Sequence, residues 1–285
     1  MRTPEQTCHK SMTLDFILEK GSGKVNEDAL LIHDNLFGVF DGATGLEKPK
    51  PCAQTTGGAI AANTAKEVFQ KNSMPLDVLA CEANRKIFEK MTSCNVDLSR
   101  RHKIWSTSAA VVRFKENFLE WVQTGDSFIL LIYKDQTFKT LVEKNDHDFE
   151  TLKLLKAESR NGSAAVARKL ETPLRQTRSM MNRSYGVLNG EKEAEIFLNR
   201  GLEPLDNVAH VLLFTDGLQI PVRIPEKRKR FAPLVDLYLE SGLDAVKNHI
   251  RDLESKDPVC SIYPRFKCHD DIAAISISLD RQQTA

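Results

Sequence analysis

The chain has 285 residues, of which 41% are apolar and 28% are charged, a composition typical of globular proteins rather than of disordered or fibrous ones. Its 40 Lys and Arg residues nearly balance its 39 Asp and Glu residues, and a net charge of +1 removes the usual electrostatic argument for a nucleic-acid or membrane-surface partner. The longest apolar runs, such as Phe128–Tyr133, are far too short to span a bilayer.

The first half of the chain predicts a hairpin followed by two helices. Ala29–Ile32 and Leu36–Phe40 are short apolar runs, and the His-Asp-Asn triplet between them favours a turn. Gln54–Lys71 is rich in alanine and other small residues, which favours a helix. Leu76–Met91 repeats apolar residues at helical spacing and so predicts a helix with one apolar face.

The rest of the chain predicts further strands around a polar segment and one more helix. Segments rich in β-branched and aromatic residues predict strands at Ser108–Phe114, Phe118–Thr124 and Ser127–Tyr133. Residues 145–183 are polar and helical in tendency, without a strong apolar face. Beyond them we expect strands at Val208–Phe214 and Ile272–Leu279, a helix at Phe231–Leu253 and a loop at Ser255–Lys267.

Strand groups interrupted by helices favour an α+β sandwich over a parallel βαβ sheet. No segment is rich enough in Gly, Ser or Pro to mark a linker, so we expect one domain over residues 1–285. The N-terminal segment has no apolar stretch after Arg2, and we expect no signal peptide. Six cysteines without paired C-x-x-C spacing argue against a disulfide framework or a zinc site, so we expect reduced thiols and a cytoplasmic location.

Acidic residues lie next to the ends of the predicted strands. A single Asp-Gly after a strand is usually a turn, but here the pattern recurs at several strongly apolar strands. Because strands of one sandwich run alongside each other, their ends can bring these carboxylates together. The acidic residues at strand ends are Glu27, Asp28, Asp41, Asp126, Asp216, Asp270 and Asp271.

Such a cluster predicts a metal site. Several carboxylates within a few ångströms repel each other and would take up protons near neutral pH. Hard divalent cations such as Mg²⁺ and Mn²⁺ prefer oxygen ligands and relieve that repulsion. Gly42, which follows Asp41, has no side chain to prevent its carbonyl from approaching an ion.

Short motifs at these positions follow one another along nearly the whole chain. They are Asn26-Glu27-Asp28, Val39-Phe40-Asp41-Gly42, Ser106-Thr107-Ser108-Ala109-Ala110, Gly125-Asp126-Ser127, Phe214-Thr215-Asp216-Gly217 and Asp270-Asp271-Ile272. The segment Arg183-Ser184-Tyr185-Gly186 is a weaker match. Each motif is weak alone, but together and in this order they resemble the type 2C metal-dependent protein serine/threonine phosphatase family.

The resemblance implies a four-layer α-β-β-α sandwich with two central, mainly antiparallel sheets, and a bacterial-type, stand-alone catalytic domain. It implies that Asp41 bridges two Mn²⁺ or Mg²⁺ ions and that Asp216 and Asp270 complete the first ion's protein ligands. The Gly42 carbonyl would ligate one of the two ions, and Glu27 or Asp28 would serve the second, partly through water. Asp126 matches an aspartate that assists a third, weaker site in some members. Residues 145–183 correspond to a variable, flap-like segment.

The activity implied by the resemblance is hydrolysis of phosphoserine and phosphothreonine in proteins by a water that bridges the two ions, with Asp41, Asp216 and Asp270 as the catalytic set. The expected partner is a phosphoprotein substrate, and the expected state is a monomer. A degenerate, phosphatase-like module that binds metal or phosphopeptide is one alternative. A hydrolase of small phosphate esters is another.

Two positions depart from the family pattern. Gly23 stands where members commonly carry an arginine that holds the substrate phosphate, and Lys24 or Arg183 is a candidate replacement, with Arg265 and Lys267 as further possibilities. Ala43 stands where eukaryotic members often have a histidine proposed as general acid.

Overall fold

A computed structural model describes residues 11–46, 55–143, 146–158 and 163–280. Its strands form two five-stranded sheets in which all paired strands are antiparallel. One sheet has the order β1 (Ser11–Glu19), β10 (Ile272–Asp280), β9 (Val208–Phe214), β6 (Phe128–Tyr133) and β7 (Phe138–Thr140). The other has the order β2 (Ala29–His33), β3 (Leu36–Ala43), β4 (Ser106–Phe114), β5 (Phe118–Thr124) and β8 (Asn199–Pro204).

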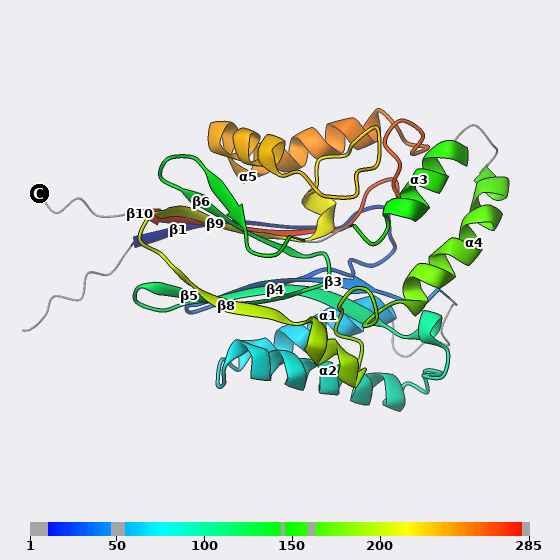
Figure 1. Cartoon of the computed structure of the whole chain (residues 1–285), viewed down its shortest axis with the longest axis horizontal. Coiled ribbons are helices and arrows are strands. Elements are labelled where there is room, and N and C mark those ends of the chain that lie inside the picture. The colour runs from blue at the N-terminus through cyan, green and yellow to red at the C-terminus, as the bar shows by residue number, and fades with distance from the viewer. Residues whose placement is uncertain (1–10, 47–54, 144–145, 159–162, 281–285) are drawn as a thin grey trace, which may run out of the picture.

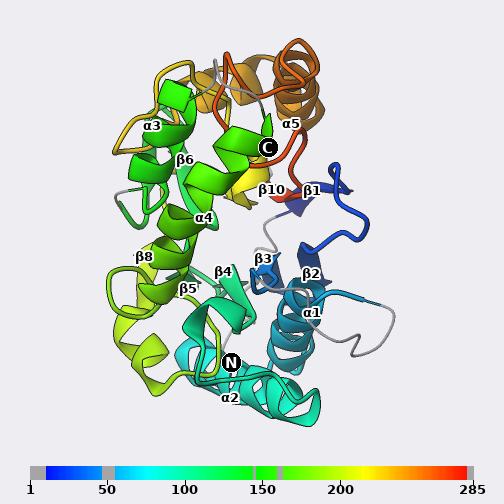
Figure 2. The ribbon, with the colours of Figure 1, turned by 90° about the vertical axis from the view of Figure 1, so that its right-hand side faces the viewer.

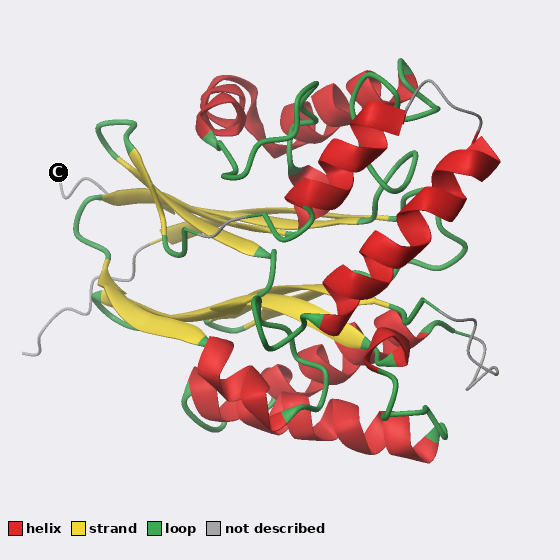
Figure 3. Ribbon diagram, turned by 45° about the vertical axis from the view of Figure 1, so that its right-hand side comes forward, coloured by secondary structure: helices red, strands yellow, loops and turns green. Residues whose placement is uncertain are grey.

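The sheets stack face to face, and helices cover their outer faces (Figures 1 and 3). The helices α1 (Gly57–Gln70) and α2 (Leu76–Ser93) pack on the sheet that contains β3, through a buried cluster that includes Phe40 and Phe69. The helix α5 (Ala232–Ser255) packs on the sheet that contains β10, through a cluster that includes Phe214. The predicted four-layer α-β-β-α sandwich is therefore confirmed.

The central strands bury one face under the helices and the other face in the core between the sheets. Alternate residues of β3, β4, β9 and β10, such as Val39, Val112, Val211 and Ile275, meet there in one apolar cluster. The opposite residues of the same strands face the helical layers, so these strands are apolar on both faces and appear in the sequence as nearly continuous apolar runs. Those runs are what made the central strands predictable.

Three strands lay outside the prediction. β1 carries apolar residues at alternate positions, a strand pattern that was visible in the sequence but was not predicted as a strand. β7 has three residues and β8 contains a Gly and a Pro, so neither has the apolar density of a central strand. All three lie at or next to the edges of the sheets, where burial constrains the sequence less.

The polar segment 145–183 contains the helices α3 (Phe149–Glu158) and α4 (Ser163–Ser179). They lie across one end of the sandwich, where Figure 2 shows them facing the viewer. None of the described helices combines the length and the hydropathy that a membrane span requires. Cys81, Cys260 and Cys268 are free thiols, but Cys94 is disulfide-bonded, so the prediction of reduced thiols is wrong at that position.

Candidate metal centre

Three carboxylates from separate parts of the chain meet at the end of the sandwich. Asp41 lies in β3, Asp126 follows β5, and Asp216 follows β9. Each offers one carboxylate oxygen, and these oxygens lie within 4.8 Å of one another. The site is thus assembled by the fold, because the residues are separated by 85 positions or more in the chain.

Strand register explains how they meet. Asp41 pairs with Ser108 of β4, and the neighbouring Ala109 pairs with Thr124 near the end of β5, two residues before Asp126. In the other sheet, Phe214 near the end of β9 pairs with Ala274 of β10, which brings Asp216 and the residues before β10 to the same end. Thr215 then fixes this junction through its amide, which donates to the Ala273 carbonyl at 2.9 Å.

The electrostatics of the cluster favour a cation. Burial, with the neighbouring carboxylates of Asp216, Asp28, Asp126 and Asp270, raises the pKa of Asp41 well above its usual range. Burial, with Asp270, Asp126 and Asp28, raises the pKa of Asp216 in the same way. The ionised carboxylates are unfavourable in the protein alone, and hard divalent cations with oxygen preference fit this donor set.

Glu27 and Asp28 have different surroundings. Glu27 lines the pocket that also contains Asp41, and its carboxylate accepts a hydrogen bond from the Thr44 hydroxyl, which in turn accepts from the Gly58 amide at 2.8 Å. Asp28 is only 6% exposed, and its carboxylate accepts from the Thr215 hydroxyl at 2.7 Å. Burial, opposed by that hydrogen bond and assisted by the charges of Asp270 and Asp271, raises the pKa of Asp28. Of the predicted pair, Glu27 is the residue that faces the pocket.

Asp270 and Asp271 also differ in their surroundings. Asp270 lines both pockets at the site and accepts from the Lys267 ammonium at 2.6 Å. Asp271 is buried and accepts from the backbone amides of Gly21 at 2.7 Å and Glu27 at 2.8 Å. Asp271 therefore holds the loop before β2 in place, while Asp270 faces the pockets.

Gly42 lies where three segments crowd together. Its amide donates to the Glu27 carbonyl at 3.2 Å, and a Cβ built on it would lie 2.3 Å from the Gly58 carbonyl oxygen and 2.5 Å from that of Glu27. Both neighbours are backbone atoms, so a larger residue cannot be accommodated by a side-chain rotation. The glycine lets β3, α1 and the loop that carries Glu27 approach each other.

We therefore expect Gly42→Ala to lower the free energy of unfolding by about 1–3 kcal/mol or more, as overpacked sites do. Gly23→Ala is the comparison variant, because its Cβ would lie 3.3 Å from the Val25 carbonyl oxygen and a shift of a few tenths of an ångström would accommodate it. Urea unfolding of the two variants without added metal, followed by circular dichroism, checks this. Equal stability of the two variants would contradict the crowding argument.

Two neighbouring parts of the chain add pocket residues that were not predicted as site residues. His147 and Asp148 of the flap-like segment, and Tyr185 just beyond it, line both pockets together with Asp126 and Asp216. The His147 ring stacks on the Tyr185 ring with centroids 3.9 Å apart, and its Nε2 lies 3.7 Å from Asp126 Oδ2 and 3.5 Å from Asp148 Oδ2. The sequence signal for His147 and Asp148 is the Asp-His-Asp triplet at 146–148. It does not directly follow a strongly apolar strand, and its spacing is not that of a metal-ligand motif.

The predicted phosphate-binding residues lie elsewhere. Lys24 and Arg183 are exposed, and neither is among the described residues that line the two pockets. Arg265 and Lys267, which were further possibilities, line both pockets.

The sequence matches a model of the family described as Protein phosphatase 2C over residues 20–253. A comparison with curated proteins finds no match. Among solved structures, the chain is similar to Stp1 from Staphylococcus aureus, with 14% identity, a TM-score of 0.59, and coverage of 98% of this chain and 100% of that chain. It is also similar to the catalytic domain of the serine threonine protein phosphatase PstP, solved with two manganese ions, with 15% identity, a TM-score of 0.58, and coverage of 94% and 97%. At these identities the structural likeness shows the fold.

Proposed function

The chain belongs to the protein phosphatase 2C family, and from that premise we propose that it is a metal-dependent phosphatase that hydrolyses phosphoserine and phosphothreonine in proteins. One observation carries the proposal: the carboxylates of Asp41, Asp126 and Asp216 come from three distant segments to within 4.8 Å of one another. Without cations, that arrangement costs the folded protein free energy. Binding of cations would offset this cost and would explain why the fold brings the carboxylates together.

In this proposal, Asp41, Asp216 and Asp270 would hold one divalent ion, and Asp41, the Gly42 carbonyl and Glu27 would hold a second. Asp126 would contribute to a third, weaker site. Mn²⁺ and Mg²⁺ are the cations that suit an all-oxygen donor set. The structure of the PstP catalytic domain in complex with two manganese ions supports the count of two.

The bound cations would supply a water acidic enough to attack phosphorus at neutral pH and positive charge for the phosphoryl oxygens. The protein's own residues fix where this happens. The hydrogen bond from Thr44 orients the Glu27 carboxylate, and the bonds that Asp271 accepts from the amides of Gly21 and Glu27 hold the loop that presents it. His147, stacked on Tyr185, closes the side of the site next to Asp126.

We also propose that the substrate protein binds at the flap-like segment. The flap-like helices α3 and α4 supply residues to a pocket that also contains Asp41, including Leu155 and Arg178, so this segment would contact the substrate protein around the phosphorylated residue. We propose that the chain acts as a monomer and as one domain, on phosphoproteins of the cytoplasm.

Metal-dependent hydrolysis is the direct test. The purified protein should hydrolyse p-nitrophenyl phosphate and phosphothreonine peptides with Mn²⁺ or Mg²⁺ present, and EDTA should abolish the turnover. Bis-p-nitrophenyl phosphate, a diester, should react far more slowly. A higher rate on small monoesters than on every peptide tested would instead favour a small-ester hydrolase.

A second candidate, a module that binds metal or phosphopeptide without turnover, is favoured by one observation. Gly23 occupies the position of the usual phosphate-binding arginine, and the adjacent Lys24 is exposed and lies outside the residues that line the pockets. Retained phosphopeptide binding without hydrolysis in any metal would support this candidate and remove the first.

A further inference from the structure

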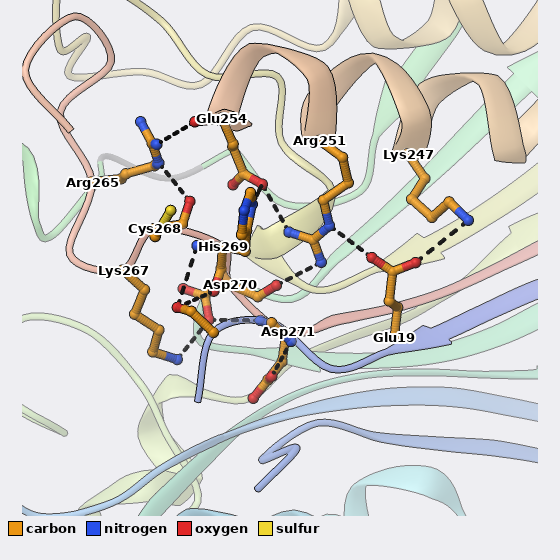
Figure 4. Close-up of polar contacts among 12 residues, drawn as sticks. Glu19, Lys247, Arg251, Glu254, Arg265, Lys267, Cys268, His269, Asp270 and Asp271 are labelled. Carbon is orange, nitrogen blue, oxygen red and sulfur yellow. Dashed lines mark hydrogen bonds and ion pairs between the residues drawn. The ribbon is translucent and has the colours of Figure 1, made fainter. Parts of the chain in front are cut away.

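The loop before β10 carries a cation to the carboxylate cluster. Lys267 lines both pockets together with Asp126, Asp216 and Asp270. Its side chain is 41% exposed, and its ammonium donates to Asp270 Oδ1 at 2.6 Å (Figure 4). An ammonium has three N–H donors, so this bond leaves two for a ligand in the pocket.

Arg265, the other loop cation at both pockets, is already engaged in holding the loop. Its guanidinium donates to the Asp257 carboxylate at 3.0 Å, and to the carbonyls of Tyr263 at 2.8 Å, Glu254 at 3.0 Å and Cys268 at 3.0 Å. Only 14% of its side chain is exposed. A substrate could recruit Arg265 only by breaking several of these bonds, which is not true of Lys267.

The loop that carries Lys267 is tied to α5 and β1. Arg251 of α5 donates to the Glu19 carboxylate at 2.7 Å, to the Glu254 carboxylate at 2.8 Å and to the Asp270 carbonyl at 2.8 Å. The His269 ring lies 2.9 Å from the same Glu254 carboxylate, and Figure 4 shows this network beside Lys267. The backbone on both sides of Lys267 is therefore held, while the ammonium end stays open to the pocket.

We propose that Lys267 binds the phosphoryl oxygens of the substrate and so supplies the charge that Gly23 cannot. This inference rests on the proposed phosphatase function. The reason is chemical: a phosphate monoester brings two negative charges to a site already rich in carboxylates, and a positive group that contacts the ester and not only the ions strengthens its binding. Lysine acts here as a point charge on a flexible stem, without the bidentate fork of arginine.

The test compares Lys267→Met with Lys24→Met, a matched control that removes the same charge outside the pocket. Calorimetry measures binding of inorganic phosphate to the Mg²⁺-loaded protein, and a separate titration measures Mg²⁺ binding. We expect Lys267→Met to weaken phosphate binding roughly tenfold to a hundredfold, as loss of a charge-assisted hydrogen bond does. Mg²⁺ affinity should change less than phosphate affinity, Lys24→Met should resemble the wild type, and Lys267→Arg should restore part of the binding.

Kinetics with p-nitrophenyl phosphate and Mn²⁺ provide a second readout. Lys267→Met should raise KM and the inhibition constant for phosphate by a similar factor. Wild-type phosphate affinity in Lys267→Met, a loss of metal binding in place of phosphate binding, or no phosphate binding by the wild type would overturn the proposal. Phosphate binding that depends on Lys267 in a wild-type protein without turnover would instead overturn the proposed function alone.

Discussion

Asp41→Asn and Asp216→Asn should each reduce metal-dependent turnover of a phosphate monoester by about 10³-fold or more, while the protein stays folded. Asparagine keeps the volume of aspartate but removes the negative charge that holds a divalent cation. Because each ion would lower the barrier by several kcal/mol, and about 1.4 kcal/mol corresponds to a factor of ten in rate, a lost ion is expected to cost several orders of magnitude.

The stability of these variants distinguishes a functional carboxylate from a structural one. In the wild type, burial and neighbouring carboxylates raise the pKa of both residues, so ionised Asp41 and Asp216 are unfavourable in the folded protein without metal. The Asp41→Asn and Asp216→Asn variants should therefore unfold in urea at the same midpoint as the wild type, or at a higher one, near pH 7.5.

Asp15→Asn, on the exposed strand β1, is the control for activity and should leave turnover unchanged. Near wild-type turnover in both Asp41→Asn and Asp216→Asn would remove the metal site from the mechanism.

Mn²⁺ should raise the unfolding temperature by roughly 5–10 °C at a concentration 100 times its dissociation constant. A ligand at that concentration stabilises a folded protein by about 2.7 kcal/mol, and 1 kcal/mol corresponds to about 2–4 °C for chains of ~150–250 residues. Differential scanning fluorimetry with and without Mn²⁺, and after EDTA, measures the shift. Asp41→Asn should show little or none of it.

The pH dependence of that shift has a definite sign. The pKa values of Asp41 and Asp216 are raised in the folded protein, so their contribution to stability without metal is fully present below about pH 4 and is lost as pH rises through the folded values. A cation binds the ionised form and replaces the protons. The Mn²⁺-induced shift should therefore be larger at pH 7.5 than at pH 5. A shift that is equal at both pH values would show that Mn²⁺ binds elsewhere.

The strand-end carboxylates could be predicted because two signals coincide at them. The central strands are apolar on both faces and therefore visible in the sequence, and Asp41, Asp126 and Asp216 each lie within two residues of the end of such a strand. Antiparallel pairing of the strands then brings these ends together, so no other sequence signal is needed to predict that the carboxylates meet. The motif resemblance added roles that spacing alone left open, such as the bridging role of Asp41, but it left open the choice between Glu27 and Asp28. In the structure those two residues differ by whether they face the pocket.

The sequence included Lys267 among several candidate cations but could not select it, and His147 could not be predicted in this way. Lys267 is carried by a loop whose course depends on side chains distant in sequence, such as Arg251 and Glu19. His147 reaches Asp126 because residues 146–148 turn toward the site, where Asp146 forms an ion pair with Lys229 at 2.7 Å. Neither loop has a periodic pattern. Proximity in sequence favoured Lys24, which adjoins Gly23 but lies outside the residues that line the pockets.

A crystal structure of the protein with Mn²⁺, with anomalous scattering recorded for manganese, tests the metal centre most directly. We expect two anomalous peaks about 3.5–4 Å apart, the spacing of two-metal hydrolases. Both should contact Asp41, one with Asp216 and Asp270 and the other with Glu27. Manganese bound away from Asp41, or no peak at the cluster under concentrations that support turnover, would contradict it.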